Sequence, residues 1–134
     1  MEPRYAAEIE AALPALLDRF YDRVRHDPRL GPVFNDGVED WAHHLATLAD
    51  FWSSVMLTSG RYKGHPVQAH MKHQARISSE MFERWLAIWR ETTDEMVSPE
   101  VAAAMQAKAA RIAQSLDLTL RFRLPKAKDA LSVA

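Results

Sequence analysis

The 134-residue sequence predicts an all-α fold. Apolar side chains recur at helical spacing along most of the chain, and no segment has the convincing alternation of a β-strand. Four tryptophans, five phenylalanines and six methionines, with only four glycines for turns, fit helices packed around something large and flat better than a sheet. The length suits one domain, which we expect over residues 1–124, followed by a disordered tail over residues 125–134.

The first predicted helix covers residues 11–26, and its apolar stripe includes Tyr21. Pro28 lies just beyond its end, where a proline stops a helix. Residues 30–37, LGPVFNDG, contain turn formers on both sides of Phe34. We therefore expect an irregular corner here that turns Phe34 inward.

The next helix is predicted over residues 38–57. Its apolar stripe has offsets of 0, 3, 7, 11 and 14 and consists of Trp41, His44, Leu48, Trp52 and Val55. His44 therefore lies on the apolar stripe, whereas its neighbour His43 does not. The segment TSGRYKG then breaks the pattern.

Three of the six histidines, at positions 65, 70 and 73, surround a Gly-His-Pro turn. Pro66 can open a short helix that carries His70 and His73 on neighbouring parts of one face. A histidine in such a helix is usually a surface residue or a satisfied core residue, so a ligand role needs support from the rest of the sequence.

Two further helices are predicted after this turn. Ser78 or Ser79 can cap the first, whose inward side chains are Phe82, Trp85, Leu86, Trp89, Thr93 and Met96. Ser98 and Pro99 supply a cap and a first-turn proline for the second, which is Ala-rich and long. Its inward side chains are Val101, Met105, Ile112, Leu116 and Leu120.

Composition excludes several classes of function. The absence of cysteine removes disulfides, thiolate nucleophiles, iron–sulfur clusters and cysteine zinc sites. With 17 Lys and Arg against 18 Asp and Glu and no long run of one sign, we expect neither a nucleic-acid nor a membrane partner. No apolar segment is long enough to span a bilayer, so we expect a cytoplasmic protein. The HExxH, GxSxG, P-loop and GxGxxG motifs are also missing.

One polar or partly polar side chain interrupts the bulky apolar stripe of each of three helices. These side chains are Tyr21, His44 and Trp85. A buried donor without a partner costs about 1–3 kcal/mol, so each must find one. The three can satisfy one another as a core network, or they can point at a bound ligand with His70 facing them from another segment.

The chain resembles the truncated haemoglobins, most closely group III, over about residues 13–120. The similarity rests on F-Y, L-G-P-x-F, W-x-x-H, F-W, Y-x-G-x-P-x-x-x-H and F-x-x-W-L in this order, a combination more specific than any single piece. They occur in FYDRVRHDPRLGPVF (20–34), DWAHHLATLADFWSSVML (40–57), YKGHPVQAH (62–70) and FERWL (82–86).

This resemblance implies a two-over-two helical sandwich around haem b, iron protoporphyrin IX. By position it implies His70 as the proximal iron ligand and Phe34 as the corner ring that stacks on the haem. It also implies that Tyr21, His44 and Trp85 line the distal side, where the iron binds its gaseous ligand.

Further haem contacts are expected by position alone. Tyr62, His73 and Arg76 are candidate partners of the haem propionates. His65 precedes the proline and would project from a turn, so we rank it far below His70 as a ligand. His44 can donate to the ligand, act as a gate or bind the iron itself, and the sequence leaves these alternatives open.

The implied function is binding of O2, NO or CO at a free iron position. Two donors, Tyr21 and Trp85, of about 1–2 kcal/mol each would slow O2 escape roughly ten- to several-hundred-fold. We therefore expect NO dioxygenase or peroxidase-like chemistry, with an unidentified external electron donor, more than O2 transport. Simple O2 binding or transport and gas sensing are alternatives, and a cofactor-free helical interaction module is a remote one.

Overall fold

The computed structural model describes residues 2–66, 70 and 76–122, with the backbone alone at residue 122. The helices are α1 (Pro3–His26), α2 (Gly31–Gly37), α3 (Trp41–Leu57), α5 (Ser79–Met96) and α6 (Pro99–Phe122). Within these described ranges there is no strand, which confirms the all-α prediction. The predicted tail at 125–134 lies outside them.

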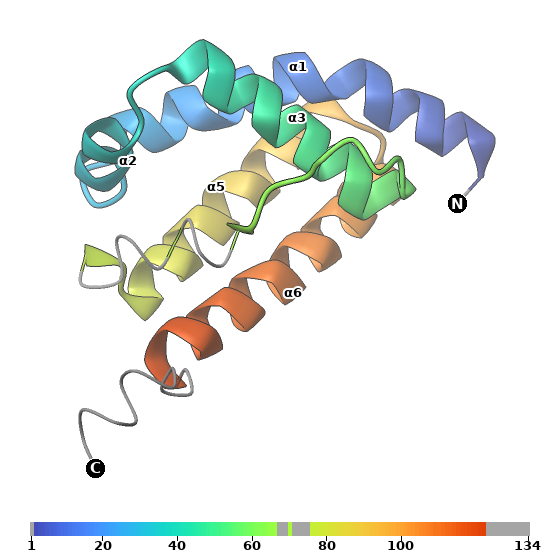
Figure 1. The fold of residues 1–134 in the computed structure, drawn as a ribbon. Coiled ribbons are helices and arrows are strands. Elements are labelled where there is room, and N and C mark those ends of the chain that lie inside the picture. Colours follow the sequence, from blue (N-terminus) through green and yellow to red (C-terminus); the bar gives the residue numbers. More distant parts are fainter. Residues whose placement is uncertain (1, 67–69, 71–75, 123–134) are drawn as a thin grey trace.

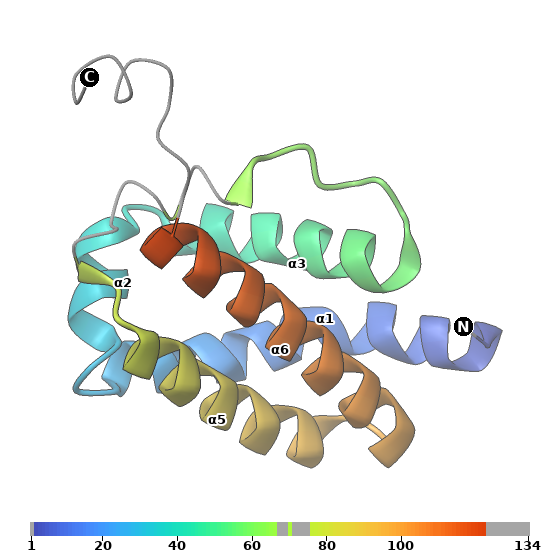
Figure 2. The ribbon, with the colours of Figure 1, turned by 90° about the horizontal axis from the view of Figure 1, so that it is seen from below.

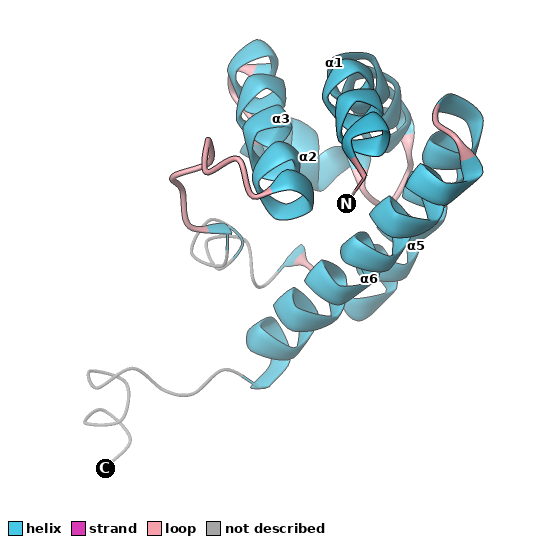
Figure 3. Cartoon of the chain, turned by 90° about the vertical axis from the view of Figure 1, so that its right-hand side faces the viewer, coloured by secondary structure: helices cyan, strands magenta, loops and turns pink. Residues whose placement is uncertain are grey.

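The long helices form two crossed layers. Helices α1 and α3 lie side by side, and α5 and α6 form the second pair beneath them (Figure 1). The views from below and from the side show the same crossing, with α2 at one end (Figures 2 and 3). Helix α1 also packs on α5, so the core lies between the layers. The predicted two-over-two arrangement is confirmed.

Helix α1 starts at Pro3, earlier than the predicted residue 11. Ile9 extends the apolar stripe and is completely buried. The carboxylate of Glu8 accepts hydrogen bonds from the backbone nitrogen and hydroxyl of Ser98, at 2.7 and 2.8 Å. The early turns therefore fasten α1 to the start of α6, a long-range contact that periodicity alone does not reveal.

The corner after α1 is helical, so the prediction of an irregular segment at 30–37 is wrong. A proline is compatible with the first turn of α2, and Gly31 lies so close to Arg25 that a Cβ would come within 2.5 Å of its carbonyl oxygen. Buried Asp27 accepts hydrogen bonds from the backbone nitrogens of Arg29 and Leu30 at 2.9 and 3.0 Å. These contacts hold the chain where it enters α2.

The remaining helices follow their predicted stripes closely. The Asp40 side chain caps α3 through the backbone nitrogen of His43, which places the start of α3 after residue 38. Ser78 caps α5, as predicted. Met96 is the exception, because it is the last residue of α5 and is 36% exposed. None of the helices in the described ranges is long and apolar enough to cross a membrane.

Candidate functional site

Three helices meet around the side chain of Tyr21. Tyr21 comes from α1 and is 4% exposed. Its ring centroid lies 5.7 Å from Phe34 of α2, and 5.8 and 5.9 Å from Trp41 and His44 of α3. The structure therefore brings together side chains that are far apart in the sequence.

The indole of Trp85 on α5 lies close to the phenol of Tyr21. Burial raises the pKa of Tyr21, and the nearby Trp85 side chain, which can only donate a hydrogen bond, partly opposes this rise. Tyr21 consequently stays protonated, and its own O–H remains able to donate to a third group.

His44 has a buried nitrogen with no hydrogen-bond partner. In the part of the chain that the structure describes, its Nε2 is the only buried side-chain nitrogen or oxygen in this condition. Burial lowers the pKa of His44, and positive charge on His70 and His43 lowers it further. The imidazole is therefore held in its neutral form. An unpaired buried group of this kind costs about 1–3 kcal/mol unless a ligand satisfies it.

His70 has one ring nitrogen engaged and one available. Its Nδ1 lies 2.7 Å from the carbonyl oxygen of Pro66. A carbonyl only accepts, so Nδ1 carries the proton and Nε2 keeps its lone pair. The effect of His70 on the pKa of His44 places the two imidazoles within electrostatic reach of each other.

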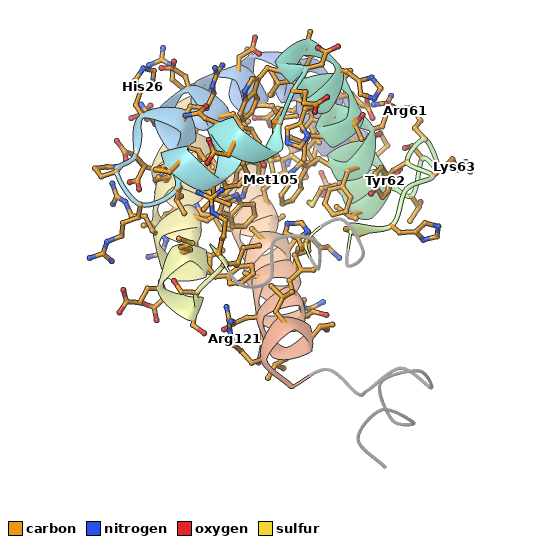
Figure 4. All side chains as sticks on the ribbon, turned by 60° about the vertical axis from the view of Figure 1, so that its left-hand side comes forward. His26, Arg61, Tyr62, Lys63, Met105 and Arg121 are labelled. Atoms are coloured by element: carbon orange, nitrogen blue, oxygen red, sulfur yellow. The ribbon has the colours of Figure 1, made fainter. Side chains whose placement is uncertain are left out.

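The other described residues predicted to contact the haem, Tyr62 and Arg76, do not form one cluster. Tyr62 is half-buried, and its ring packs edge-on against Phe51 at 5.2 Å. It lies on the loop after α3, between Arg61 and Lys63 (Figure 4). Arg76 is exposed and forms a 3.0 Å ion pair with Asp36.

Two further histidines, His65 and His73, belong to the same stretch of sequence as His70. His65 is exposed, in keeping with its low ranking as a ligand. His73 lies outside the described residues, so its expected contact with a propionate stays a prediction.

Trp41 and Phe20 are members of the cluster that sequence reasoning did not single out. The Trp41 ring lies 5.4 Å from His44, and Phe20 packs edge-on against both Tyr21 and Trp85, at 4.7 and 5.6 Å. Both lie on the apolar stripes of their helices, and this position was the sequence feature that could have identified them. Stripe position does not distinguish a wall of the site from ordinary core.

The cluster fits a haem better than it fits a metal held by protein groups alone. The unpaired His44 nitrogen, the free Tyr21 proton and the surrounding aromatic rings suit a flat apolar group that carries a polar ligand. His70 offers one neutral imidazole nitrogen. Among the described residues, no group of three or more His, Asp or Glu side chains could hold a metal ion.

Comparison with known proteins gives the same assignment. The profile of the bacterial-like globin family matches residues 8–117. A group 3 truncated haemoglobin, ctb, of Campylobacter jejuni is 31% identical over 108 residues, covering 78% of this chain and 84% of that protein. The crystal structure of the group III truncated haemoglobin from Campylobacter jejuni matches with a TM-score of 0.75 and 29% identity, covering 87% of this chain and 94% of that one.

The family match, the two-over-two helices and the cluster around Tyr21 lead to one conclusion. The chain belongs to the bacterial-like globin family as a truncated haemoglobin, and this membership implies a haem cofactor.

Proposed function

We propose that the protein binds haem b through His70 and carries out redox chemistry on a diatomic ligand or peroxide held by Tyr21, His44 and Trp85. The observation that carries this proposal is the buried Nε2 of His44, which has no protein partner. A group that is costly to leave unpaired is retained where a ligand completes it.

The axial role of His70 is supported by its hydrogen bond to Pro66. Donation from Nδ1 to the carbonyl oxygen at 2.7 Å selects the tautomer whose Nε2 can coordinate iron. The same bond orients the ring from the first turn of its segment.

The distal side offers two hydrogen-bond donors. Burial keeps Tyr21 protonated, so its hydroxyl can donate to the ligand. The unpartnered Nε2 of His44 donates when Nδ1 is the deprotonated nitrogen, and the neutral ring reaches this tautomer without gaining charge. Donors aimed at one point favour ligands that accumulate negative charge on oxygen.

When bound, the haem supplies an iron position for O2, NO or CO and the redox chemistry of such ligands. The donors slow the escape of O2, which suits reaction in place better than delivery. With O2 held in this way, NO and one electron give nitrate, and an external reductase is proposed to supply that electron. Reduction of hydrogen peroxide to water at the same place would require two electrons and two protons.

The remaining contacts are proposed by position. Phe34 is half-buried beside Tyr21 and is proposed to stack on the haem. Tyr62, His73 and Arg76 are proposed partners of the propionates. Arg76 already forms an ion pair with Asp36. To bind a propionate, it would therefore have to exchange the Asp36 carboxylate for that of the propionate.

Visible spectroscopy tests the proposal directly. The purified protein, supplied with haem, is recorded in the oxidised state and then reduced with and without CO, beside His70→Ala and the control His65→Ala. We expect a Soret band that shifts with CO, is lost or grossly altered in His70→Ala, and is unchanged in the control. A protein that takes up no haem would contradict the proposed function and favour the cofactor-free helical module.

A second measurement addresses the chemistry. The reduced, oxygenated protein is mixed with NO, and nitrate is quantified. One nitrate for each haem is the expected result. Release of O2 without nitrate would leave simple O2 binding as the function.

A further inference from the structure

Three tryptophans form a continuous stack that leads away from the proposed distal site. Trp85 and Trp89 lie one turn apart on α5, with ring centroids 6.0 Å apart and planes 2° from parallel. Trp52 of α3 stacks on Trp89 at 4.4 Å and 17°. Trp89 therefore contacts both of the other indoles, within the range of favourable offset stacking.

The stack connects the site to the interior of the protein. Trp85 is half-buried and lies close to Tyr21, whereas Trp89 and Trp52 are 0% and 1% exposed. Phe20 packs edge-on against Trp85 and Trp89 at 5.6 and 4.8 Å. Little solvent reaches the far end of the stack, where Trp52 keeps 1% of its surface exposed, and each ring contacts the next.

We propose that the stacked indoles Trp85, Trp89 and Trp52 conduct electrons to the haem pocket when hydrogen peroxide reacts there, so that the oxidation appears at Trp52. This inference rests on the proposed function, because it requires haem beside Trp85. Indoles are among the most easily oxidised side chains, and rings in direct contact exchange electrons readily.

The overall reaction balances. Hydrogen peroxide loses its O–O bond and takes up two electrons and two protons to give two waters. Without an external donor, Trp52 supplies both electrons through Trp89 and Trp85, and one water adds its oxygen to the Trp52 ring with release of two protons. The sum is one peroxide and one tryptophan giving one hydroxytryptophan and one water. With an external one-electron donor such as ascorbate, the oxidised indoles are reduced again before water adds to Trp52.

A hydrogen bond to the backbone holds the ring nitrogen of Trp89, the middle indole of the relay. The Trp89 Nε1–H donates to the carbonyl oxygen of Met105 at 3.2 Å, and a carbonyl is too weak a base to remove the proton. An oxidised Trp89 therefore keeps its proton and regains its electron from Trp52. Met105 lies in the interior on α6 and marks this part of the core in Figure 4.

Peptide mass spectrometry locates the oxidation. The haem-loaded protein receives one equivalent of hydrogen peroxide without a donor, and oxygen addition is mapped for the wild type, Trp89→Phe, Trp52→Phe and the control Tyr5→Phe. Tyr5 lies in the first turn of α1, where its hydroxyl bonds Arg4, away from the proposed distal residues. Met96, which is 36% exposed, reports direct reaction with peroxide in every sample.

We expect oxygen addition at Trp52 in the wild type and in Tyr5→Phe, and a several-fold loss of it in Trp89→Phe at equal Met96 oxidation. In Trp52→Phe, oxygen addition should occur at Trp89 or Trp85 instead. If Trp89→Phe does not fold by circular dichroism, Trp52→Phe decides the question alone. Ascorbate should suppress oxygen addition at Trp52, and the haem-free wild type should show no such addition.

Two outcomes would overturn the relay. One is Trp52 oxidation that is undiminished in Trp89→Phe, and the other is an unmodified Trp52 in a wild type whose Soret band is bleached by peroxide. Both leave the proposed function intact, because they presuppose bound haem. Failure to bind haem is detected separately, by the absence of a Soret band before peroxide is added.

Discussion

The two ends of α3 treat their polar groups in opposite ways. Near its start, the Nε2 of His44 is buried without a partner. Near its end, the buried hydroxyl of Ser53 donates to the Glu10 carboxylate and shares a 2.8 Å bond with Ser59. Arg61 closes this second group through a 3.0 Å ion pair with Glu10.

This difference separates a stabilising contact from a functional one. The Ser53 group ties α1, α3 and the following loop together with satisfied hydrogen bonds, which contribute to folding. The His44 end lowers the free energy of unfolding, because its unpaired nitrogen opposes folding until a ligand binds. Helices α1 and α3 are therefore held together by hydrogen bonds at the Ser53 end, called here the fastened end. At the His44 end, called here the available end, a polar atom is left for a ligand.

The largest expected effect comes from breaking the fastened end. Ser53→Val removes a buried hydroxyl and leaves oxygen atoms of Glu10 and Ser59 without its hydrogen bonds. We expect the free energy of unfolding of the haem-free protein to fall by about 2 kcal/mol, as measured by urea denaturation. Ser115→Ala, at an exposed serine of α6, is the control. An unchanged midpoint in Ser53→Val would show that this end contributes no stability.

The next effect concerns the available end in the haem-loaded protein. Tyr21→Phe removes the proposed donor and should accelerate O2 dissociation roughly tenfold, which corresponds to about 1.4 kcal/mol. Stopped-flow displacement by CO measures the rate. Tyr5→Phe removes a phenol hydroxyl that bonds Arg4 at the far start of α1, and it should leave the rate unchanged. Equal rates in Tyr21→Phe and wild type would remove the donor argument.

A smaller effect of opposite sign is expected for His44→Leu. Replacing the unpaired imidazole by an apolar side chain should raise the free energy of unfolding of the haem-free protein by about 1 kcal/mol. His43→Leu alters the neighbouring exposed histidine and should be nearly neutral. Destabilisation by His44→Leu would mean that the Nε2 nitrogen is satisfied in the folded protein.

The smallest effect is a pH dependence at the fastened end. The hydrogen bond from Ser53 lowers the pKa of Glu10 below its ordinary 4.5, burial opposes this shift, and Arg61 lowers the pKa further. A lowered folded-state pKa means that the unfolded chain takes up the proton first, so the stabilisation is present above pH 4.5 and is lost as the pH falls below it. Glu10→Gln should therefore be less stable than wild type at pH 7, by about 0.5 kcal/mol for so exposed a pair, and the gap should close in acid.

Glu83→Gln is the control for this pH series, because Glu83 is an exposed carboxylate of α5. Its difference from wild type should be small at every pH. A Glu10→Gln gap that persists unchanged in acid would indicate that the carboxylate acts through packing and not through its charge.

Much of the fold and the composition of the candidate site could be predicted because helical stripes are local. The positions of Tyr21, His44 and Trp85 on inward faces follow from spacing alone, and the ordered motifs pointed to the correct family. The start of α1 and the helical form of α2 were missed. Both depend on contacts with distant segments, namely Glu8 with Ser98 and Gly31 with Arg25.

The sequence by itself determined the amphipathic helices, the absence of thiol chemistry and the residues available to a haem, since composition and spacing carry that information. Only the tertiary structure decided which donors are satisfied. It brings Trp85 close to the phenol of Tyr21, frees the Nε2 of His70 through the Pro66 carbonyl and leaves His44 unpaired. Hydrogen bonding depends on distance and direction between groups from different segments, and no linear pattern specifies these until the helices have packed.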